Sequence, residues 1–399
     1  MKVLLIDNAC KHGSTGEICY NLYNYINRAG HTAAVFYGRG EAIDEENIYK
    51  FGLDHETLMH AFLSRLTGFN GCFSPLSTRR LIRRIEAFRP DVIHLHELHA
   101  YFVDIAPLIE YIKKRGIPVV WTFHCEYMYT GKCGHAGTCE RWKTGCGHCP
   151  SVRDYPKSLF FDQTARMFSE KSRLLGDLKA VYVTPSEFFA KRVRQSFLRN
   201  KRVEVINNGI NTEIYYPRGK GKARSELGIP ADRTIVLSVA PWIMSRAKGG
   251  GWVLELAKRQ KDPRVEYMLV GDGERIEKPL ENVTIVPLVR NRAKLAEIYS
   301  EADCFVLCSE HETFSLTCAE ALCCGVPVAG FKCGAPETIF KHPWAEFVDY
   351  GDLDGLEKAI AVQLNRDRGG IPEYGAQTFS KEKMCSAYLK QYLESVEEI

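Results

Sequence analysis

The stretch that most constrains this fold is residues 304–334, which contain one strand–loop–helix–strand unit. Residues 305–307 are apolar and are followed by polar residues, which is typical of a short buried parallel strand. Apolar residues then recur at helical spacing over about 315–324. Gly325 is placed to end that helix before a second apolar strand at 326–329. The chain is therefore expected to build an α/β sheet.

The helix in this stretch begins where α/β proteins bind phosphate. The amides of Phe314, Ser315 and Leu316 are expected at a helix N-terminus just beyond the carboxyl end of a strand, where they can donate to an anion. Two carboxylates flank the turn, Glu312 before the helix and Glu320 in its second turn. A retaining glycosidase needs its carboxyl groups about 5 Å apart. Glu312 and Glu320 are separated by a loop and by helical residues that rise ~1.5 Å each. The two carboxylates are therefore expected at opposite ends of one ligand instead.

Length and composition indicate an ordinary globular protein with two domains. The chain has 399 residues, of which 45% are hydrophobic and 26% are charged. Its apolar runs are shorter than the ~20 residues of a membrane span, and its first apolar run is too short for a signal peptide. A cytoplasmic protein is therefore expected.

The net charge of +4 is unevenly divided along the chain. Residues 1–205 carry 29 Lys and Arg against 21 Asp and Glu, a net charge of +8, and the remainder carries −4. The basic first half predicts a polyanionic partner or an anionic membrane surface, so a peripheral location at the inner face of the membrane is expected.

Strands that alternate with helices predict two parallel sheets. Apolar strands are expected at 3–6, 32–37, 92–95, 119–123, 180–184 and 203–206, and again at 235–239, 265–270 and 283–287. Residues 38–75 are expected to be irregular. The predicted domains are 1–206 and 218–379, joined by a turn-rich linker at 207–217. An amphipathic helix is expected at 380–399.

The motif Glu312-x7-Glu320, followed by Gly-Val-Pro-Val at 325–328 and Gly-Ala-Pro-Glu at 334–337, resembles the signature of retaining glycosyltransferase family 4. The resemblance implies a GT-B fold, with two doubly wound Rossmann-like domains facing each other across a cleft and a C-terminal helix that crosses back. It also implies metal-independent transfer of a hexosyl unit without a catalytic cofactor. The donor would be a UDP- or GDP-linked sugar, and the acceptor a saccharide or lipid-linked molecule used in surface polysaccharide synthesis.

The resemblance also assigns the residues that would hold the nucleotide sugar. Glu320 would bind the ribose hydroxyls, and Glu312 with the amides of residues 314–316 would bind the donor sugar and its diphosphate. Gly271 begins a loop that would line the nucleotide pocket, and Val289 lies near the loop expected to contact the base.

Further family roles fall on basic, glycine and histidine residues. Lys248 and Arg246 precede a glycine run and a helix start, and they match the basic pair that neutralises the departing diphosphate. Gly13 and Gly16, in the turn after the first strand, would lie beside the donor phosphates and the acceptor. His124, at the end of a strand, matches the active-site histidine.

Four of the fifteen cysteines fall in one short segment after this histidine: Cys133, Cys139, Cys146 and Cys149. The family pattern has Asp where this chain has Cys125, and the segment that follows resembles an insertion in members that build bacterial surface polysaccharides. The clustered cysteines, the glycines among them and the scarcity of apolar residues predict one structural Zn²⁺ held by four thiolates in a closed tetrahedral site, although the spacing is not a paired C-x2-C set. Two disulfides, four free thiols, or His135 or His148 in place of one cysteine are the alternatives.

Two other functions share parts of this pattern. A nucleotide-sugar epimerase or phosphorylase has the same fold but lacks the Glu pair combined with the cysteine segment. A zinc-dependent nucleic-acid-binding protein would suit the basic first half, but most of the chain is patterned as α/β sheet and the second half is acidic. No nucleic-acid partner is therefore expected.

Overall fold

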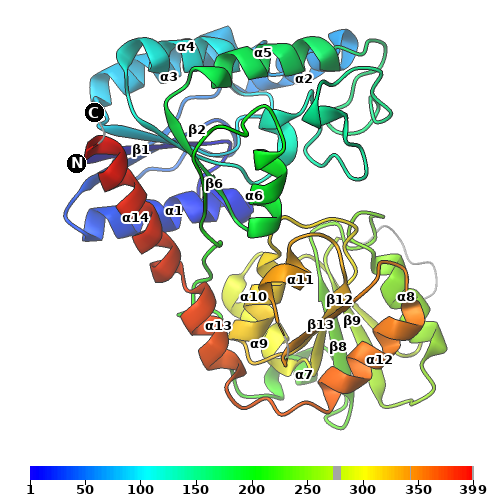
Figure 1. The fold of residues 1–399 in the computed structure, drawn as a ribbon. Helices are drawn as coiled ribbons and strands as arrows, with labels where there is room; N and C mark the ends of the chain where they lie inside the picture. The colour runs from blue at the N-terminus through cyan, green and yellow to red at the C-terminus, as the bar shows by residue number, and fades with distance from the viewer. Residues whose placement is uncertain (273–279, 342, 398–399) are drawn as a thin grey trace. The chain divides into compact units, whose positions relative to one another are not determined.

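The computed structural model describes residues 1–272, 280–341 and 343–397. The chain divides into two compact units. Unit 1 contains Met1–Asn207 and the C-terminal segment from Met384, and unit 2 contains Asn208–Lys383 (Figure 1). Each unit is a parallel sheet with helices on both faces, so the expected fold class of two doubly wound sheets is confirmed.

Unit 1 is built on a seven-stranded sheet with the order β3-β2-β1-β4-β5-β6-β7. Every pairing in it is parallel. Its strands are β1 (Lys2–Asp7), β2 (Thr32–Tyr37), β3 (Ile48–Lys50), β4 (Val92–Leu95), β5 (Val119–Thr122), β6 (Ala180–Thr184) and β7 (Val203–Val205). The central strands are almost wholly apolar because both of their faces are covered.

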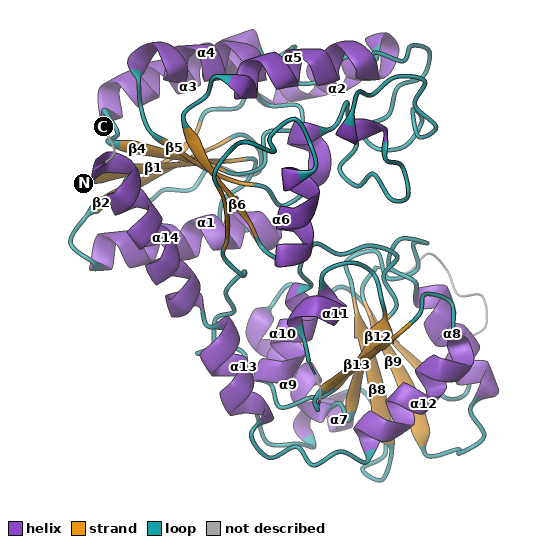
Figure 2. Ribbon diagram, in the orientation of Figure 1, coloured by secondary structure: helices purple, strands orange, loops and turns teal. Residues whose placement is uncertain are grey.

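Helices cover both faces of this sheet (Figure 2). They are α1 (Gly13–Arg28), α2 (Asp54–Thr67), α3 (Pro75–Phe88), α4 (Ile105–Arg115), α5 (Thr164–Gly176), α6 (Glu187–Arg194) and α14 (Lys381–Glu397), with short 3₁₀ turns at Glu126–Tyr129 and Arg141–Lys143. Helices α3, α4 and α5 pack on one face, and α1 and α14 pack on the other. The end of the expected C-terminal helix, residues 398 and 399, lies outside the described residues.

Unit 2 repeats the pattern with a six-stranded parallel sheet in the order β10-β9-β8-β11-β12-β13. Its strands are β8 (Thr234–Val239), β9 (Val265–Val270), β10 (Val283–Val286), β11 (Cys304–Leu307), β12 (Val328–Phe331) and β13 (Ala345–Val348). Its helices are α7 (Lys222–Glu226), α8 (Gly250–Arg259), α9 (Arg292–Glu301), α10 (Leu316–Cys323), α11 (Pro336–Ile339), α12 (Leu353–Leu364) and α13 (Ile371–Phe379). Helices α9, α10 and α13 cover one face, and α8 and α12 cover the other.

One sequence-based expectation is wrong: residues 38–75 are not irregular, because they contain β3 and the whole of α2. The reason lies in the side chains of α2. Its buried positions include the polar residues Glu56 and His60, whereas Leu58 and Phe62 are exposed. An apolar stripe facing the core is therefore missing, and the helical period is hidden in the sequence.

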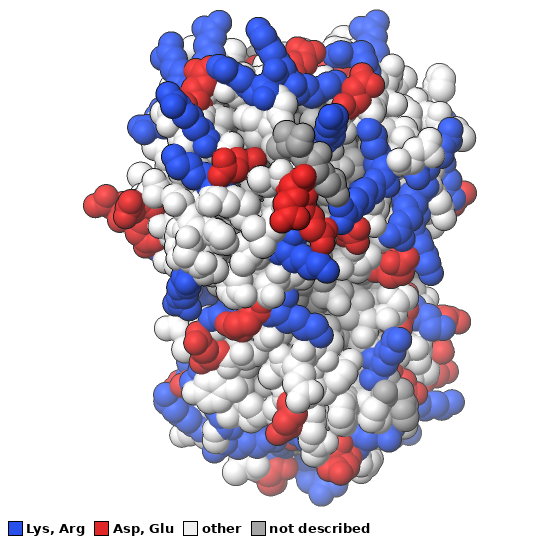
Figure 3. All heavy atoms as spheres, turned by 60° about the vertical axis from the view of Figure 1, so that its left-hand side comes forward, with Lys and Arg blue, Asp and Glu red and all other residues white. Residues whose placement is uncertain are grey.

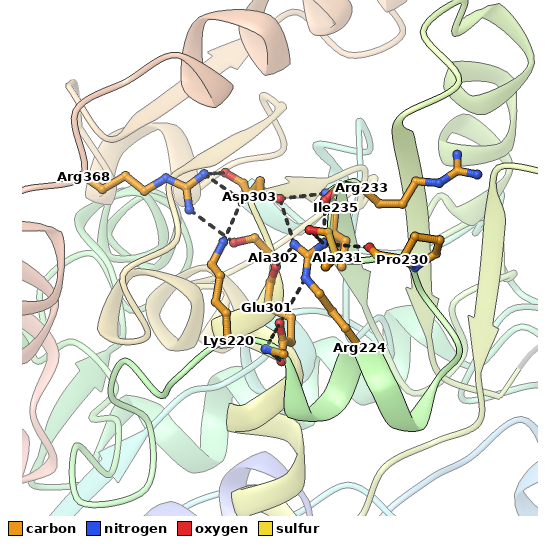
Figure 4. Close-up of polar contacts among 11 residues, drawn as sticks. Lys220, Arg224, Pro230, Ala231, Arg233, Ile235, Glu301, Ala302, Asp303 and Arg368 are labelled. Carbon is orange, nitrogen blue, oxygen red and sulfur yellow. Dashed lines mark hydrogen bonds and ion pairs between the residues drawn. The ribbon is translucent and has the colours of Figure 1, made fainter.

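A buried ion network fixes the edge of the unit 2 sheet where β8 and β11 begin (Figure 4). Arg224 on α7 donates from Nε to Glu301 Oε2 at 3.1 Å and from Nη2 to Asp303 Oδ2 at 3.3 Å. Glu301 also accepts from the amide of Gly221 at 2.8 Å, and Asp303 from the amide of Ile235 at 2.9 Å. These bonds join α7 to the end of α9 and to the starts of both strands.

Candidate functional site

The strand order of unit 2 places its two central loops at one edge of the sheet. Strands β8 and β11 are neighbours in the sheet. From β8 the chain continues to β9 on one side of this pair, and from β11 it continues to β12 on the other side. In doubly wound sheets, ligands bind outside the carboxyl ends of strands at this switch point. The loop after β8 carries Lys248, and the loop after β11 carries Glu312.

These two predicted site residues are in contact. Lys248 Nζ lies 2.7 Å from Glu312 Oε1, and the two side chains are 34% and 18% exposed. Gly249, next to the lysine, adopts a left-handed φ of 74°, and a Cβ on it would lie 2.1 Å from the carbonyl oxygen of Cys308. Glycine is therefore needed to bring the lysine loop against the end of β11. The result is an ammonium group that is half-buried at the edge of the sheet.

The start of α10 stands immediately after this pair. Ser315 has a left-handed φ of 81°, and its Oγ accepts a hydrogen bond from the amide of Cys318 at 3.4 Å. Phe314 is buried against the rings of Phe340 and Phe379, at centroid distances of 5.8 and 6.0 Å. The aromatic anchor and the cap fix the direction in which α10 begins at Leu316. The first amides of a helix have no intrahelical acceptor, so this N-terminus can receive an anion.

Glu320 is held on the inner side of α10 by tyrosine hydroxyl groups. Tyr299 donates to its Oε2 at 2.9 Å, and Tyr215 also forms a hydrogen bond to this carboxylate. Burial raises the pKa of Glu320 to about 7, although the two tyrosines and the nearby Arg292 oppose the rise. Its protonation therefore changes near neutral pH.

Three other residues predicted in this unit do not join the Lys248–Glu312 pair. The side chain of Arg246 is 90% exposed and lies 3.5 Å from Glu310. A Cβ on Gly271 would lie 1.8 Å from the carbonyl oxygen of Ala240, so close backbone packing explains this glycine without a ligand. Val289 is half-buried against the apolar core. Their donor-binding roles stay predictions.

In unit 1 the two predicted glycines lie at the start of α1. Gly13 has a left-handed φ of 72° and is the first residue of the helix, which begins one turn earlier than its expected start at Glu17. Gly16 packs against the loop after β1, where a Cβ would lie 3.1 Å from the carbonyl carbon of Ala9. Both residues therefore serve the close approach of helix and loop.

His124 belongs to a row of histidines at the carboxyl ends of β4 and β5. Its Nε2 shares a hydrogen bond with His96 Nδ1 at 3.0 Å. Both ring nitrogens of His94 are bonded to hydroxyl groups, Nδ1 to Tyr392 at 2.7 Å and Nε2 to Thr122 at 2.8 Å. Burial lowers the pKa of His124, which favours a neutral ring at pH 7. The hydroxyl partners of His94 favour an orienting role for this histidine over metal binding.

Sequence reasoning missed several groups beside this row. Glu97 and His99 form an ion pair, and Cys125 Sγ donates to Glu97 Oε2 at 3.2 Å. Asp7 is fully buried at the end of β1 and accepts from the amide of Glu97 at 3.2 Å. Burial raises the pKa of Asp7 to about 7. The available signal was position alone, because each of these residues lies at or just beyond the carboxyl end of a strand.

Family models match both halves of the chain. Residues 16–214 match the model described as Glycosyltransferase Family 4, and residues 233–366 match the model described as Glycosyl transferases group 1. The chain belongs to glycosyltransferase family 4. This membership favours the glycosyltransferase over the epimerase, phosphorylase and nucleic-acid-binding alternatives.

Individual relatives agree with the family. A protein described as "Putative colanic acid biosynthesis glycosyl transferase WcaC", from Escherichia coli (strain K12), is 26% identical over 430 residues that cover 98% of this chain and 99% of the relative. Sucrose-phosphate synthase from Thermosynechococcus elongatus superposes with a TM-score of 0.68 at 17% identity over the whole of both chains. Anabaena HepE in complex with UDP gives a TM-score of 0.67 at 15% identity, over 99% of this chain and 100% of that chain. The solved structures show that the fold is GT-B.

None of the helices in the described part of the chain is both long enough and apolar enough to cross a bilayer.

Proposed function

We propose that this glycosyltransferase moves a hexosyl unit from a UDP- or GDP-linked sugar to a saccharide or lipid-linked acceptor, with retention of configuration, in bacterial surface polysaccharide synthesis. The observation that carries the donor assignment is the Lys248–Glu312 contact at the switch point of unit 2, beside the N-terminus of α10. Structures of HepE with UDP and with UDP-glucose support a nucleotide sugar as donor. The relative named for colanic acid biosynthesis supports a polysaccharide product.

The proposed chemistry needs positive charge where the sugar bond breaks. As the diphosphate departs, negative charge develops on its oxygens, and preorganised donors lower the barrier by stabilising that charge. The ammonium of Lys248 and the first amides of α10 supply such donors, while Glu312 keeps the lysine in place before the substrate arrives. Metal-independent transfer is part of this proposal, as is a contact between His124 and the donor sugar. Retention is inferred from the Glu312–Glu320 motif.

The test begins with a panel of nucleotide sugars, with products identified by mass spectrometry and their anomeric configuration by NMR. Lys248→Ala should then lower kcat about 10²–10³-fold, the usual effect of removing one preorganised donor. Lys258→Ala is the matched control, because Lys258 lies on α8, the helix that follows the Lys248 loop, and its side chain is 55% exposed. Equal turnover in the two variants would refute the assignment, and activity abolished by EDTA would refute metal independence.

A surface of unit 1 supports association with a membrane. Five apolar side chains on α2 and the 158–163 loop are at least half exposed: Leu58, Met59, Phe62, Phe160 and Phe161. The loop lies against α2, since the amide of Leu159 donates to the carbonyl of Arg65 at 2.8 Å. Unit 1 also carries exposed arginines on its helices: Arg65 on α2, Arg79 and Arg83 on α3, and Arg166 on α5. Figure 3 shows Lys and Arg side chains gathered on one face of unit 1, at the top of the view.

Exposed apolar groups and exposed cations on one unit suit an anionic lipid surface, which would also carry a lipid-linked acceptor. We expect the protein to sediment with vesicles containing anionic phospholipid and to bind more weakly as salt rises. Phe62→Ser should reduce this binding, whereas Val362→Ser, at an exposed apolar position on α12 of unit 2, should not. No binding even at low salt would exclude the membrane while leaving the donor assignment intact.

A further inference from the structure

The four clustered cysteines of unit 1 line one small cavity. Cys133, Cys139, Cys146 and Cys149 are all half-buried around a space of about 20 Å³. The thiols of Cys133 and Cys149 share a hydrogen bond. None of the four is in a disulfide in the structure. Residues spaced over the whole segment thus line one cavity.

Backbone amides are aimed at the sulfur atoms. The amide of Gly131 donates to Cys146 Sγ at 3.2 Å, and the amide of Ser151 donates to the sulfur of Cys149. Such bonds stabilise thiolates and are typical of the surroundings of metal-bound cysteines. The loop backbone is therefore already arranged for sulfur atoms that carry negative charge.

Two buried lysines accompany the thiols. Lys132, which also lines the cavity, is 2% exposed, and Lys171 is 4% exposed. Lys132 Nζ donates to the carbonyls of Val152 and Asp154, and Lys171 Nζ donates to three further carbonyls, the nearest being Tyr127 at 2.6 Å. Buried cations require negative charge nearby. One Zn²⁺ bound by four thiolates carries a net charge of −2, which would balance two ammonium groups.

The segment itself has little regular structure to keep it ordered. Between the end of the first 3₁₀ turn at Tyr129 and the start of α5 at Thr164, the described residues form one 3₁₀ turn, Arg141–Lys143. Loops of this length in a compact domain are uncommon without an organising element. Trp142 is buried and donates from Nε1 to the carbonyl of Cys139 at 2.7 Å, which anchors only the middle of the loop.

The sulfur atoms are wider apart than in a filled tetrahedral site. Among the described residues, no three of these sulfurs lie within 4.8 Å of one another. With Zn–S near 2.3 Å, a tetrahedral site would place them about 3.8 Å apart. Gly145 and Gly147, on either side of Cys146, have φ values of 159° and 141°, which give this part of the loop freedom to move inward.

We propose that Cys133, Cys139, Cys146 and Cys149 bind one structural Zn²⁺ and release their thiol protons to solvent. Four protein ligands leave no position for water, so the ion is not catalytic. Its effect reaches the histidine row through Glu126, two residues after His124. The amide of Glu126 donates to the carbonyl of Gly134 at 2.7 Å, and its carboxylate accepts from the amide of Ala136. The metal would thus hold the loop that fixes the chain beyond β5.

Zinc content tests the proposal directly. The full chain is purified without added metal, and its zinc content is measured by elemental mass spectrometry. The same measurement is made on Cys146→Ser and on the matched control Cys72→Ser, which changes an exposed cysteine outside the cluster. We expect about one zinc per chain in the wild type and the control, and loss of most of it with a lower Tm in Cys146→Ser. Less than about half an equivalent in the wild type, or undiminished zinc in Cys146→Ser, would overturn the proposal.

A second measurement on the wild type does not depend on the folding of the variant. A mercurial thiol reagent added to the native protein should release zinc to a metal indicator as the cluster thiols react. Replacement of the metal by Co²⁺ should give the sulfur-to-cobalt charge-transfer bands of a tetrahedral thiolate site. If alkylation of denatured, unreduced protein leaves the four cysteines unmodified, they form disulfides and the proposal fails.

Discussion

Glu320→Gln is expected to stabilise unit 2 at alkaline pH while weakening donor binding. Burial raises the pKa of Glu320 from 4.5 to about 7, despite the opposing hydrogen bonds from Tyr299 and Tyr215. Because the folded-state pKa lies above the unfolded value, stability from this group is fully present below pH 4.5 and is lost as the pH rises through about 7. Glutamine resembles the protonated carboxyl group and removes this loss.

The magnitude follows from the size of the pKa change. A rise from 4.5 to about 7, at about 1.4 kcal/mol per unit, gives an upper bound of about 3.5 kcal/mol. Glu320 is partly open to solvent, which screens its charge, so we expect a gain of about 1–2 kcal/mol at pH 8 and none near pH 4. We propose, from the family resemblance, that Glu320 accepts hydrogen bonds from the ribose hydroxyls, and loss of its charge should then weaken nucleotide binding about tenfold or more.

Denaturation of the wild type and Glu320→Gln from about pH 4 to pH 8.5 measures the first effect, and calorimetric titration with UDP and GDP at pH 8 measures the second. Glu255→Gln is the control, because the side chain of Glu255 is 48% exposed on α8. A stability difference that does not grow with pH would refute the reasoning about burial. Unchanged affinity for both nucleotides would separately refute the proposed role of Glu320 in donor binding.

Three further outcomes are expected. Arg224→Met should destabilise unit 2 by about 3–5 kcal/mol, because it leaves the buried carboxylate of Glu301 without its charged partner; the loss is measured as reduced hydrogen-exchange protection of β8 and β11. Lys222→Met, at a 67% exposed side chain, should cost less than about 1 kcal/mol. Tyr392→Phe should cost about 1–3 kcal/mol in urea denaturation, because a ring nitrogen of buried His94 loses its partner. Gly249→Ala should lower turnover in the donor assay through strain and a clash with the end of β11, and wild-type activity would contradict that geometry.

The sequence was most informative where a local pattern fixes a position in the fold. Lys248 and Glu312 are 64 residues apart, yet both follow short apolar strands, and parallel strands bring such loops to one edge of a sheet. The start of α10 and its end before Gly325, which has a left-handed φ of 79°, could be predicted for the same reason.

Side-chain partners chosen by tertiary packing could not be predicted in this way. The contact of Glu97 with His99 and Cys125 depends on how the ends of β4 and β5 meet, which no local spacing encodes. The turn of Arg246 toward Glu310 is likewise decided by a loop without periodicity. Helix α2 could not be predicted because several of its apolar side chains face solvent and polar side chains occupy its buried positions. Its sequence therefore lacks the apolar period that indicates a helix packed on a core.

The assignment of the last residues to unit 1 has a consequence for how the protein is made. Tyr388 and Tyr392 of α14 are fully buried against the sheet whose first strand begins at Lys2. A ribosome releases the N-terminal portion first, but that portion has an uncovered apolar face until the final helix emerges. Unit 2, contained within one continuous segment, has no such dependence. A stop codon before residue 384 should therefore destabilise unit 1, although most of that unit is encoded at the other end of the gene.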